Sequence, residues 1–219
     1  MTKRISKQLK SFKYSGEPIK VTFGTLLLVC FCILLLIIAT FTQFSITHYY
    51  FPLDVSAYQD NGLFDYTKTY RYIPQIPTVF FIMALLGRKF GILTVCGYII
   101  LGMFFPIFAL GGGITYLFEY GFGYILAFIP AMFFSGTLLK VKTDFLRIVL
   151  LTILGVCAIH ILGILYMLFI ATLRHAPMDL ISSWISSQSG VQIFYDIIFS
   201  VLTVYLGRIT RKVTWIIMC

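Results

Sequence analysis

Charged residues are scarce in this sequence. Only 11% of its 219 residues are Asp, Glu, Lys or Arg, and only 8 residues are acidic. A soluble domain has about 45–50% apolar and about 25% charged residues, whereas 59% of this chain is hydrophobic. A water-soluble fold of this size cannot bury so much apolar side chain. The composition therefore excludes a cytosolic enzyme, a nucleic-acid-binding protein and a disordered chain, and it predicts an all-α integral membrane protein with a single domain, 1–219.

Groups that catalyse reactions or hold metal ions are also few. The 3 histidines are scattered, and the sequence has no nucleophile elbow, zinc motif or phosphate-binding loop. Cys30 and Cys32 lie in one apolar run, where residues at this spacing face different sides of a helix. The sequence therefore predicts no catalytic residues, no metal site, no cofactor and no ATPase activity of its own.

Long apolar runs separated by short basic clusters predict six transmembrane helices, since about 20 apolar residues cross a bilayer. The expected spans are about 23–44, 72–87, 90–105, 121–139, 148–173 and 191–206. A basic segment, 1–20, precedes the first span, a tyrosine-rich polar loop, 45–72, follows it, and a basic tail, 207–219, ends the chain. The first apolar run is too long for a signal-peptide core, so we expect an uncleaved helix.

The distribution of positive charge predicts the orientation in the membrane. Six spans place both termini on one side, and that side then holds every Lys and Arg except Lys68, Arg71 and Arg174. Cytoplasmic loops carry an excess of Lys and Arg. We therefore expect a multi-pass protein of the cell membrane with both termini inside (N-in/C-in). The net charge of +9 is then expected to contact the anionic headgroups of the lipid bilayer, with no nucleic acid as partner.

A proline-rich segment at 73–78 is the first indication of a binding site. Irregular backbone within a membrane persists only where protein buries it or where it lines a water-filled cavity. Pro74 and Pro77 flank Gln75, whose amide offers donors and an acceptor to a ligand, and Thr78 follows. The alternative for Gln75 is a hydrogen bond to backbone groups that the prolines leave unpaired.

A glycine run breaks the chain between the third and fourth predicted helices. It consists of Gly111, Gly112 and Gly113, and consecutive glycines do not form a stable helix interior. The run permits a close approach of the backbone to a ligand or to another helix. Tyrosines near this region offer a stacking face and a hydroxyl group to a ligand, and otherwise serve in packing or at the membrane interface. These candidates are Tyr98, Tyr116 and Tyr124.

Asp196 is the strongest single candidate for a binding residue. It lies beside Tyr195 in the last predicted span, where a carboxylate at membrane depth costs about 3 kcal/mol. We expect Asp196 to accept hydrogen bonds from ligand N–H groups, with Tyr195 in the same site, and either Gln75 or a glycine N–H to serve a ligand carbonyl. The alternative for Asp196 is a structural partner such as Tyr, Ser or a helix N-terminus. His160 lies alone on an apolar helix and is expected to make a hydrogen-bonded contact between helices.

Three stretches carry motifs in a familiar order and spacing. They are YIPQIPTVFFIMALLGRKFG at 72–91, YxxxGxxxPIFALGGG at 98–113 and GFGYILAF at 121–128. Together they resemble the BioY family, the biotin-binding S components of energy-coupling-factor (ECF) transporters. The resemblance is continuous over about 72–140 and extends more weakly through the sixth predicted helix.

The resemblance implies a six-helix membrane protein that binds biotin in an outward-facing pocket. It also implies an ECF energising module of two ATPases and a transmembrane scaffold subunit as partner, and a substrate-cradling role for Gly111 to Gly113. Asp196 matches the aspartate of a sixth-helix motif that usually reads Pro-Gly-Asp-x-x-Lys. This chain has Tyr195 in place of the glycine and Phe199 in place of the lysine. The missing lysine removes a candidate partner for the biotin carboxylate.

Several alternatives stay open at this point. Arg174 or Lys68 could replace the missing lysine, or the chain could be an S component for a different small vitamin. An intramembrane enzyme would have to use Asp196, Glu119 and His160, which the predicted topology places at different depths. A structural or assembly protein would have the candidate pocket filled by its own side chains.

Overall fold

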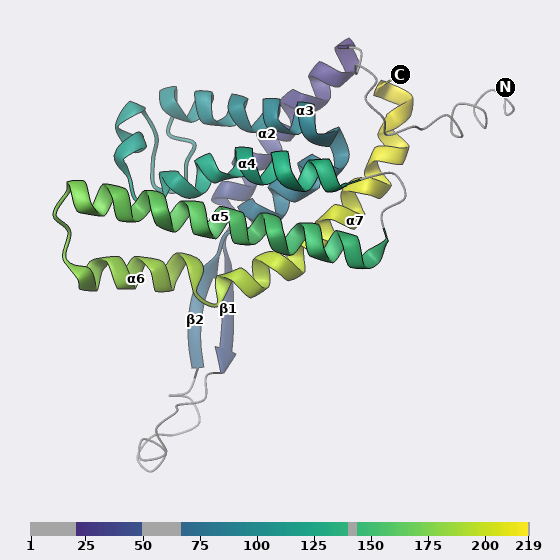
Figure 1. Ribbon diagram of the computed structural model, residues 1–219. Helices are drawn as coiled ribbons and strands as arrows, with labels where there is room; N and C mark the ends of the chain where they lie inside the picture. Colours follow the sequence, from purple (N-terminus) through teal and green to yellow (C-terminus); the bar gives the residue numbers. More distant parts are fainter. Residues whose placement is uncertain (1–20, 50–66, 140–143, 219) are drawn as a thin grey trace, which may run out of the picture.

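The structure is a computed structural model that describes residues 21–49, 67–139 and 144–218. The expectations for 1–20 and for most of the 45–72 loop fall outside the described residues. The elements in chain order, drawn in Figure 1, are α2 (Phe23–Phe41), β1 (Phe44–Tyr49), β2 (Thr67–Tyr72), α3 (Gln75–Phe104), the 3₁₀ helix η3 (Ile114–Phe118), α4 (Phe122–Leu138), α5 (Phe145–Leu173), α6 (Met178–Ser189) and α7 (Gln192–Met218).

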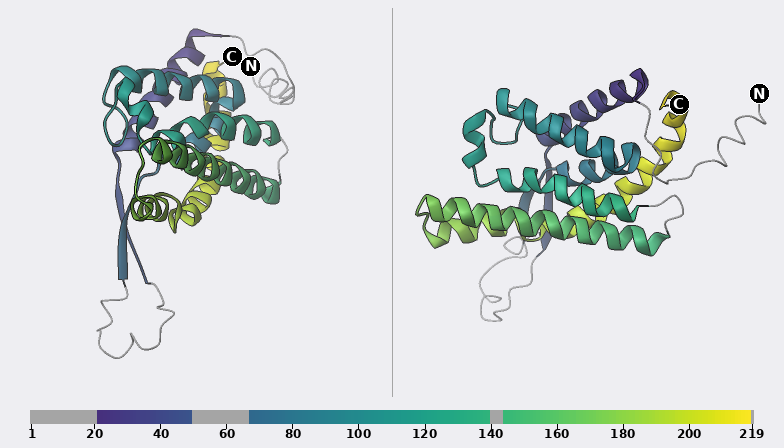
Figure 2. Two further views of the ribbon diagram at one scale, coloured as in Figure 1. Left: turned by 60° about the vertical axis from the view of Figure 1, so that its left-hand side comes forward. Right: turned by 45° about the horizontal axis from the view of Figure 1, so that its top comes forward.

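The helices form a bundle with an apolar outer surface. α4 lies along α5, α3 contacts α2, α4 and α7, and α6 runs beside α5 (Figure 1, Figure 2). Large apolar side chains on their outer faces are exposed, among them Phe31, Leu165 and Leu202, as on helices that face lipid. Within the described residues, four helical segments are long and apolar enough to cross a membrane: Phe23–Phe41, Gln75–Phe104, Phe145–Leu173 and Met178–Thr214. α4 is apolar but shorter. These helices agree with the predicted class, a helical membrane protein.

α3 consists of two helices joined at a sharp turn. Gly87 has φ 76° and ψ 174°, a backbone conformation that is essentially restricted to glycine. The chain folds back after this turn, because a Cβ on Gly91 would lie 3.5 Å from the Cα of Met83. In a straight helix, residues at this sequence separation lie about 12 Å apart along the axis. The two halves, 75–86 and 88–104, coincide with the second and third predicted spans.

The described ends of the 45–72 loop form an antiparallel β-ribbon, which the sequence prediction did not include. β1 pairs with β2 from Phe44 opposite Tyr72 to Tyr49 opposite Thr67. Both strands are rich in threonine and aromatic residues, which favour extended backbone. The ribbon projects away from the helices beside the junction of α6 and α7 (Figure 1, Figure 2). Its base, and not its projecting end, therefore lies where it can contribute to a site among the helices.

The region after the fifth predicted span also differs from the prediction. The sequence predicts a short loop around 174–179, whereas Met178–Ser189 forms the 12-residue helix α6. This helix is rich in serine, and a search for long apolar runs therefore passes over it. α7 continues to Met218, so the predicted basic tail is helical over most of its length.

The broken segment between α3 and α4 is held by packed aromatic rings. Phe108 lies over Gly102, where a Cβ would be only 1.9 Å from the ring. The Phe108 ring centroid lies 5.4 Å from that of Tyr98, 4.7 Å from that of Tyr116 and 6.1 Å from that of Phe122. Aromatic pairs at such distances are favourable. They fix the path of a segment that has little regular secondary structure.

We expect Gly87→Ala to destabilise the protein, because alanine is strained at the backbone angles of Gly87. The expected cost is about 1–3 kcal/mol, measured as a lower midpoint of thermal unfolding in detergent by intrinsic fluorescence. Gly121→Ala is the matched control, since Gly121 has φ −75° and ψ −17°, which alanine adopts without strain. Equal midpoints for the two variants would contradict a glycine requirement at this turn.

Candidate functional site

A cavity of about 670 Å³ lies where the base of the ribbon, the broken segment and helices α3 to α7 meet. Sites for small molecules typically have about 300–1,000 Å³. Ile76, Ile125 and Phe128 provide apolar wall, while α6 contributes serines together with Trp184. Apolar walls with a few polar groups are the usual composition of a site for a small organic ligand.

The orientation of the Gln75 amide is fixed by its neighbours. Its Nε2 donates to the Tyr98 hydroxyl at 2.8 Å and to Oγ1 of Thr40 at 3.0 Å. Thr40 uses its own hydrogen on the Leu36 carbonyl at 2.8 Å, so it can only accept from Gln75 and from Tyr98, which lies 3.0 Å away. The amide nitrogen therefore faces the protein. Because Gln75 lines the cavity, its Oε1 is left as an acceptor for a ligand, whereas the sequence analysis offered Gln75 or a glycine N–H as the donor to a ligand carbonyl.

Asp196 is completely buried, and both of its oxygens have partners. Oδ1 accepts from the Tyr72 hydroxyl at 2.9 Å, and Oδ2 lies 3.2 Å from Nε2 of His160. Buried carboxylates are tolerated only where such partners replace water. Asp196 is not among the lining residues and lies behind a wall to which His160 and Gln192 contribute. Its direct contact with a ligand stays a prediction, while the alternative of a tyrosine partner is present in the structure.

The hydrogen bonds continue from His160 to α6 and α4. Nδ1 of His160 lies 2.9 Å from Oγ of Ser189, which lies 2.7 Å from the Tyr124 hydroxyl. If Nε2–H donates to the Asp196 carboxylate, Nδ1 accepts from Ser189, and Ser189 accepts from Tyr124. A single directional network then joins β2, α4, α5, α6 and α7 around the cavity. The predicted helix–helix hydrogen bond of His160 is confirmed.

Tyr116 of η3 provides a further hydroxyl group among the residues that line the cavity. Burial raises the pKa of Tyr116 to about 12, so the phenol keeps its proton throughout the physiological pH range. Tyr116 lines the cavity together with Ala109 and Leu110 of the broken segment. The phenol can therefore donate a hydrogen bond to a ligand.

The glycine run makes a close approach to the end of α3. A Cβ on Gly112 would lie 2.2 Å from the carbonyl oxygen of Phe105, and the N–H of Gly113 donates to the carbonyl of Gly102 at 2.8 Å. Of the two expectations for this run, a ligand or another helix, the structure contains the contact with a helix. The residues just before the run, and not Gly111 to Gly113, are among those that line the cavity.

The structure brings some of the predicted residues to the cavity and places others behind it. The predicted residues that line it are Gln75, Tyr116 and Tyr124. Tyr98 lies behind Gln75 as described above. Thr78 donates its hydroxyl to the carbonyl of Pro74 at 2.8 Å, and the Tyr195 ring lies 6.3 Å from that of Phe199. Thr78 and Tyr195 therefore act in local packing and hydrogen bonding, and their contact with a ligand stays a prediction.

Sequence reasoning missed lining residues on the ribbon and on α6. Arg71 was assigned only to the outer side of the membrane, yet it lines the cavity. Arg174, one of the two proposed substitutes for the missing lysine, lies 3.5 Å from Glu119 and is not a lining residue. The side chain of Lys68 lies outside the described part of the chain. The signal for α6 was its serine-rich sequence, which on a helix places hydroxyl groups along one face.

A family model matches residues 72–214, well over half of the chain, and it is the model of the BioY family. The chain belongs to the BioY family. Among solved structures, this BioY family member is similar to the crystal structure of the S-component for biotin from an ECF-type ABC transporter. The TM-score is 0.63 at 22% sequence identity, over 90% of this chain and 95% of that chain. This similarity establishes the shared fold. A sequence search of curated proteins found no match.

Membership of the BioY family makes this chain a transporter subunit and not an enzyme. One expectation attached to the enzyme alternative is wrong, since His160 and Asp196 do not lie at different depths but contact each other at 3.2 Å. Glu119 takes no part in that contact and pairs with Arg174. The His160–Asp196 pair instead joins helices, as expected of ionisable groups inside a helical membrane bundle.

We expect Ser189→Ala to destabilise the protein, because the buried Tyr124 hydroxyl and His160 Nδ1 lose their shared partner. The expected cost is about 1–3 kcal/mol, measured by thermal unfolding in detergent. Ser182→Ala on the same helix is the control, since the Ser182 hydroxyl is exposed and bonds only the carbonyl of Asp179 among the described residues. A midpoint for Ser189→Ala equal to that of Ser182→Ala would refute the importance of the network.

Proposed function

We propose that this BioY family protein is the substrate-binding (S) subunit of an ECF-type importer and that it binds biotin in the cavity. The observation that carries this proposal is the fixed Gln75 amide, which presents Oε1 to a cavity with apolar walls. Membership of the BioY family and the fold shared with a biotin S-component support it.

The polar groups of the cavity complement the N–H donors and the carbonyl acceptor of a ureido ring. In the proposed complex, Oε1 of Gln75 accepts from a ureido N–H, and the Tyr116 hydroxyl donates to the ureido carbonyl. The sulfur-containing ring and the alkyl chain lie against Ile125 and Phe128. Hydrogen bonds in a site from which water is excluded are stronger than in water. A few correctly placed polar groups therefore suffice to select this ligand.

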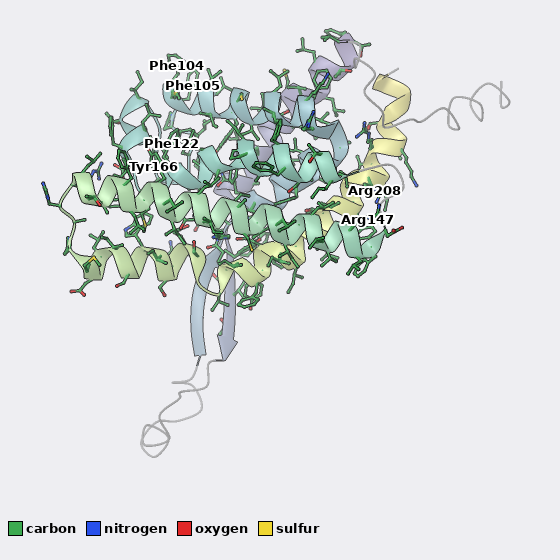
Figure 3. The ribbon with its side chains drawn as sticks, in the orientation of Figure 1. Phe104, Phe105, Phe122, Arg147, Tyr166 and Arg208 are labelled. Carbon is green, nitrogen blue, oxygen red and sulfur yellow. The ribbon has the colours of Figure 1, made fainter. Side chains whose placement is uncertain are left out.

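We propose six spans with both termini on the cytoplasmic side of the plasma membrane. The two antiparallel halves of α3 supply two spans, and α2, α4, α5 and α7 supply the others. Figure 3 supports this arrangement, because Arg147 and Arg208 lie near one end of the bundle while Phe104 and Phe105 lie toward the other. Positive charge gathered at one end is typical of the cytoplasmic side.

We also propose an ECF energising module, with two ATPases and a transmembrane scaffold subunit, as the partner that drives import. The sequence has no phosphate-binding loop of its own, so the energy for uptake against a gradient has to come from elsewhere. The described residues that line the cavity all belong to this chain, so the proposed binding step can be tested with the isolated subunit.

Isothermal titration calorimetry of the purified protein with biotin tests the proposal directly. We expect binding at micromolar or lower ligand concentration, and competition with other small vitamins should leave biotin preferred. Absence of biotin binding by correctly folded protein would refute the proposal. Preference for a different vitamin would support the role as an S subunit and contradict biotin as its substrate.

We expect Gln75→Leu to weaken biotin binding about 10-fold or more, since a ureido N–H then loses its acceptor in a desolvated site. Calorimetry measures the affinity, and the unfolding midpoint reports whether the variant is folded. Thr42→Val is the control, because this hydroxyl is exposed at the end of α2 and bonds the carbonyl of Ile38. Equal affinities for Gln75→Leu and the unchanged protein would remove Gln75 from the site.

A further inference from the structure

Arg71 is the only Lys, Arg, Asp or Glu among the described residues that line the cavity. It lies in β2 at the base of the ribbon, opposite Ser45, and its side chain is exposed. The other lining residues are apolar or carry hydroxyl, amide, indole or imidazole groups. A full positive charge at the edge of such a cavity lowers the energy of an anionic group that binds there.

The position of Arg71 is determined by its neighbour Tyr72. Successive side chains of a strand point to opposite faces. Tyr72 points into the bundle, where it is 1% exposed and donates to Asp196 at 2.9 Å. Arg71 therefore lies on the opposite face of the strand from that buried hydrogen bond, and it is one of the residues that line the cavity. The buried hydrogen bond of Tyr72 therefore fixes the strand at this point and, with it, the position of the Arg71 side chain.

Arg71 has no acidic partner among the described residues. Asp144 pairs with Arg147, Glu119 pairs with Arg174, and Asp196 bonds Tyr72 and His160. No ion pair between described residues includes Arg71. Its guanidinium is therefore available for an anion that comes with the ligand.

The spacing along the chain limits how far this charge can lie from Gln75. Arg71 is four positions before Gln75, so their Cα atoms lie at most about 14 Å apart. A ligand with its neutral head against Gln75 and an alkyl chain directed to the edge of the cavity brings its other end to Arg71. Phe199, which stands where the family motif has a lysine, packs against Tyr72 with ring centroids 5.3 Å apart. α7 therefore supplies no cation at that position, and the cation of this site comes from Arg71 on the ribbon.

We infer that the Arg71 guanidinium binds the carboxylate of the ligand and so selects an anionic substrate. This inference rests on the proposed function and names the group that anchors the acid end. A guanidinium matches a carboxylate with parallel N–H···O bonds, a geometry that lysine does not reproduce. Arg71 acts here as a specificity-determining residue that contacts the ligand itself.

The experiment compares biotin with biotinamide, in which a neutral amide replaces the carboxylate. Calorimetry gives both affinities for the unchanged protein and for Arg71→Gln, Arg71→Lys and Arg174→Gln. Arg174→Gln is the matched control, since it removes an arginine that lies 3.5 Å from Glu119 and is not a lining residue. The ratio of the two affinities, and not either affinity alone, reports the contact with the carboxylate.

We expect the unchanged protein and Arg174→Gln to prefer biotin over biotinamide about 10-fold, the usual size of a charge-assisted hydrogen bond at a partly exposed site. Arg71→Gln should bind both ligands equally and keep its affinity for biotinamide within about threefold. Arg71→Lys should retain part of the preference.

Two results would overturn the assignment of Arg71 and leave the proposed function standing. One is an unchanged preference for biotin in Arg71→Gln, and the other is an equal loss of affinity for both ligands, which would indicate a structural role. If the unchanged protein binds both ligands without preference, the carboxylate is not recognised and the inference also fails. Failure of the unchanged protein to bind either ligand would overturn the proposed function itself, and this inference with it.

Discussion

The site depends on one buried carboxylate and the donors that satisfy it. Asp196 is completely buried, so its carboxylate depends on partners that replace water, among them the Tyr72 hydroxyl and Nε2 of His160. Those two partners come from the base of the ribbon and from α5. Because an unpaired buried carboxylate is costly, β2, α5 and α7 are held in fixed positions relative to one another. His160 extends this constraint to α6 and α4 through Ser189.

This constraint explains how the polar groups of the cavity can be specific. Fixed walls keep the apolar surfaces apart, and the few polar groups are oriented by residues behind them, as Thr40 and Tyr98 orient Gln75. A preorganised acceptor pays little entropy when the ligand arrives. The proposed roles divide accordingly: Gln75 and Tyr116 recognise the neutral head, Arg71 recognises the acid, and Asp196 positions the parts of the chain that carry them.

The sequence predicted the helices better than the site. Apolar runs are intrinsic to the chain, so the spans near 23–44, 121–139 and 148–173 were found with boundaries within a few residues of α2, α4 and α5. Serine-rich α6 and the β-ribbon were not predicted from the sequence, because neither forms a long apolar run. Asp196 was identified as unusual from its surroundings, but whether its oxygens face a ligand or other side chains depends on residues 36 and 124 positions away.

The sequence by itself determined that this chain is typical of a membrane protein, where its long apolar runs lie, and which residues are too costly to be there without a purpose. Its motifs were also sufficient to indicate the BioY family, to which the match over 72–214 assigns it. Only the tertiary structure decided which atoms of the Gln75 amide are bonded within the protein and that Arg71 lies at the cavity. Hydropathy is summed along the chain, whereas the direction of a hydrogen bond is set by partners that only the folded chain brings together.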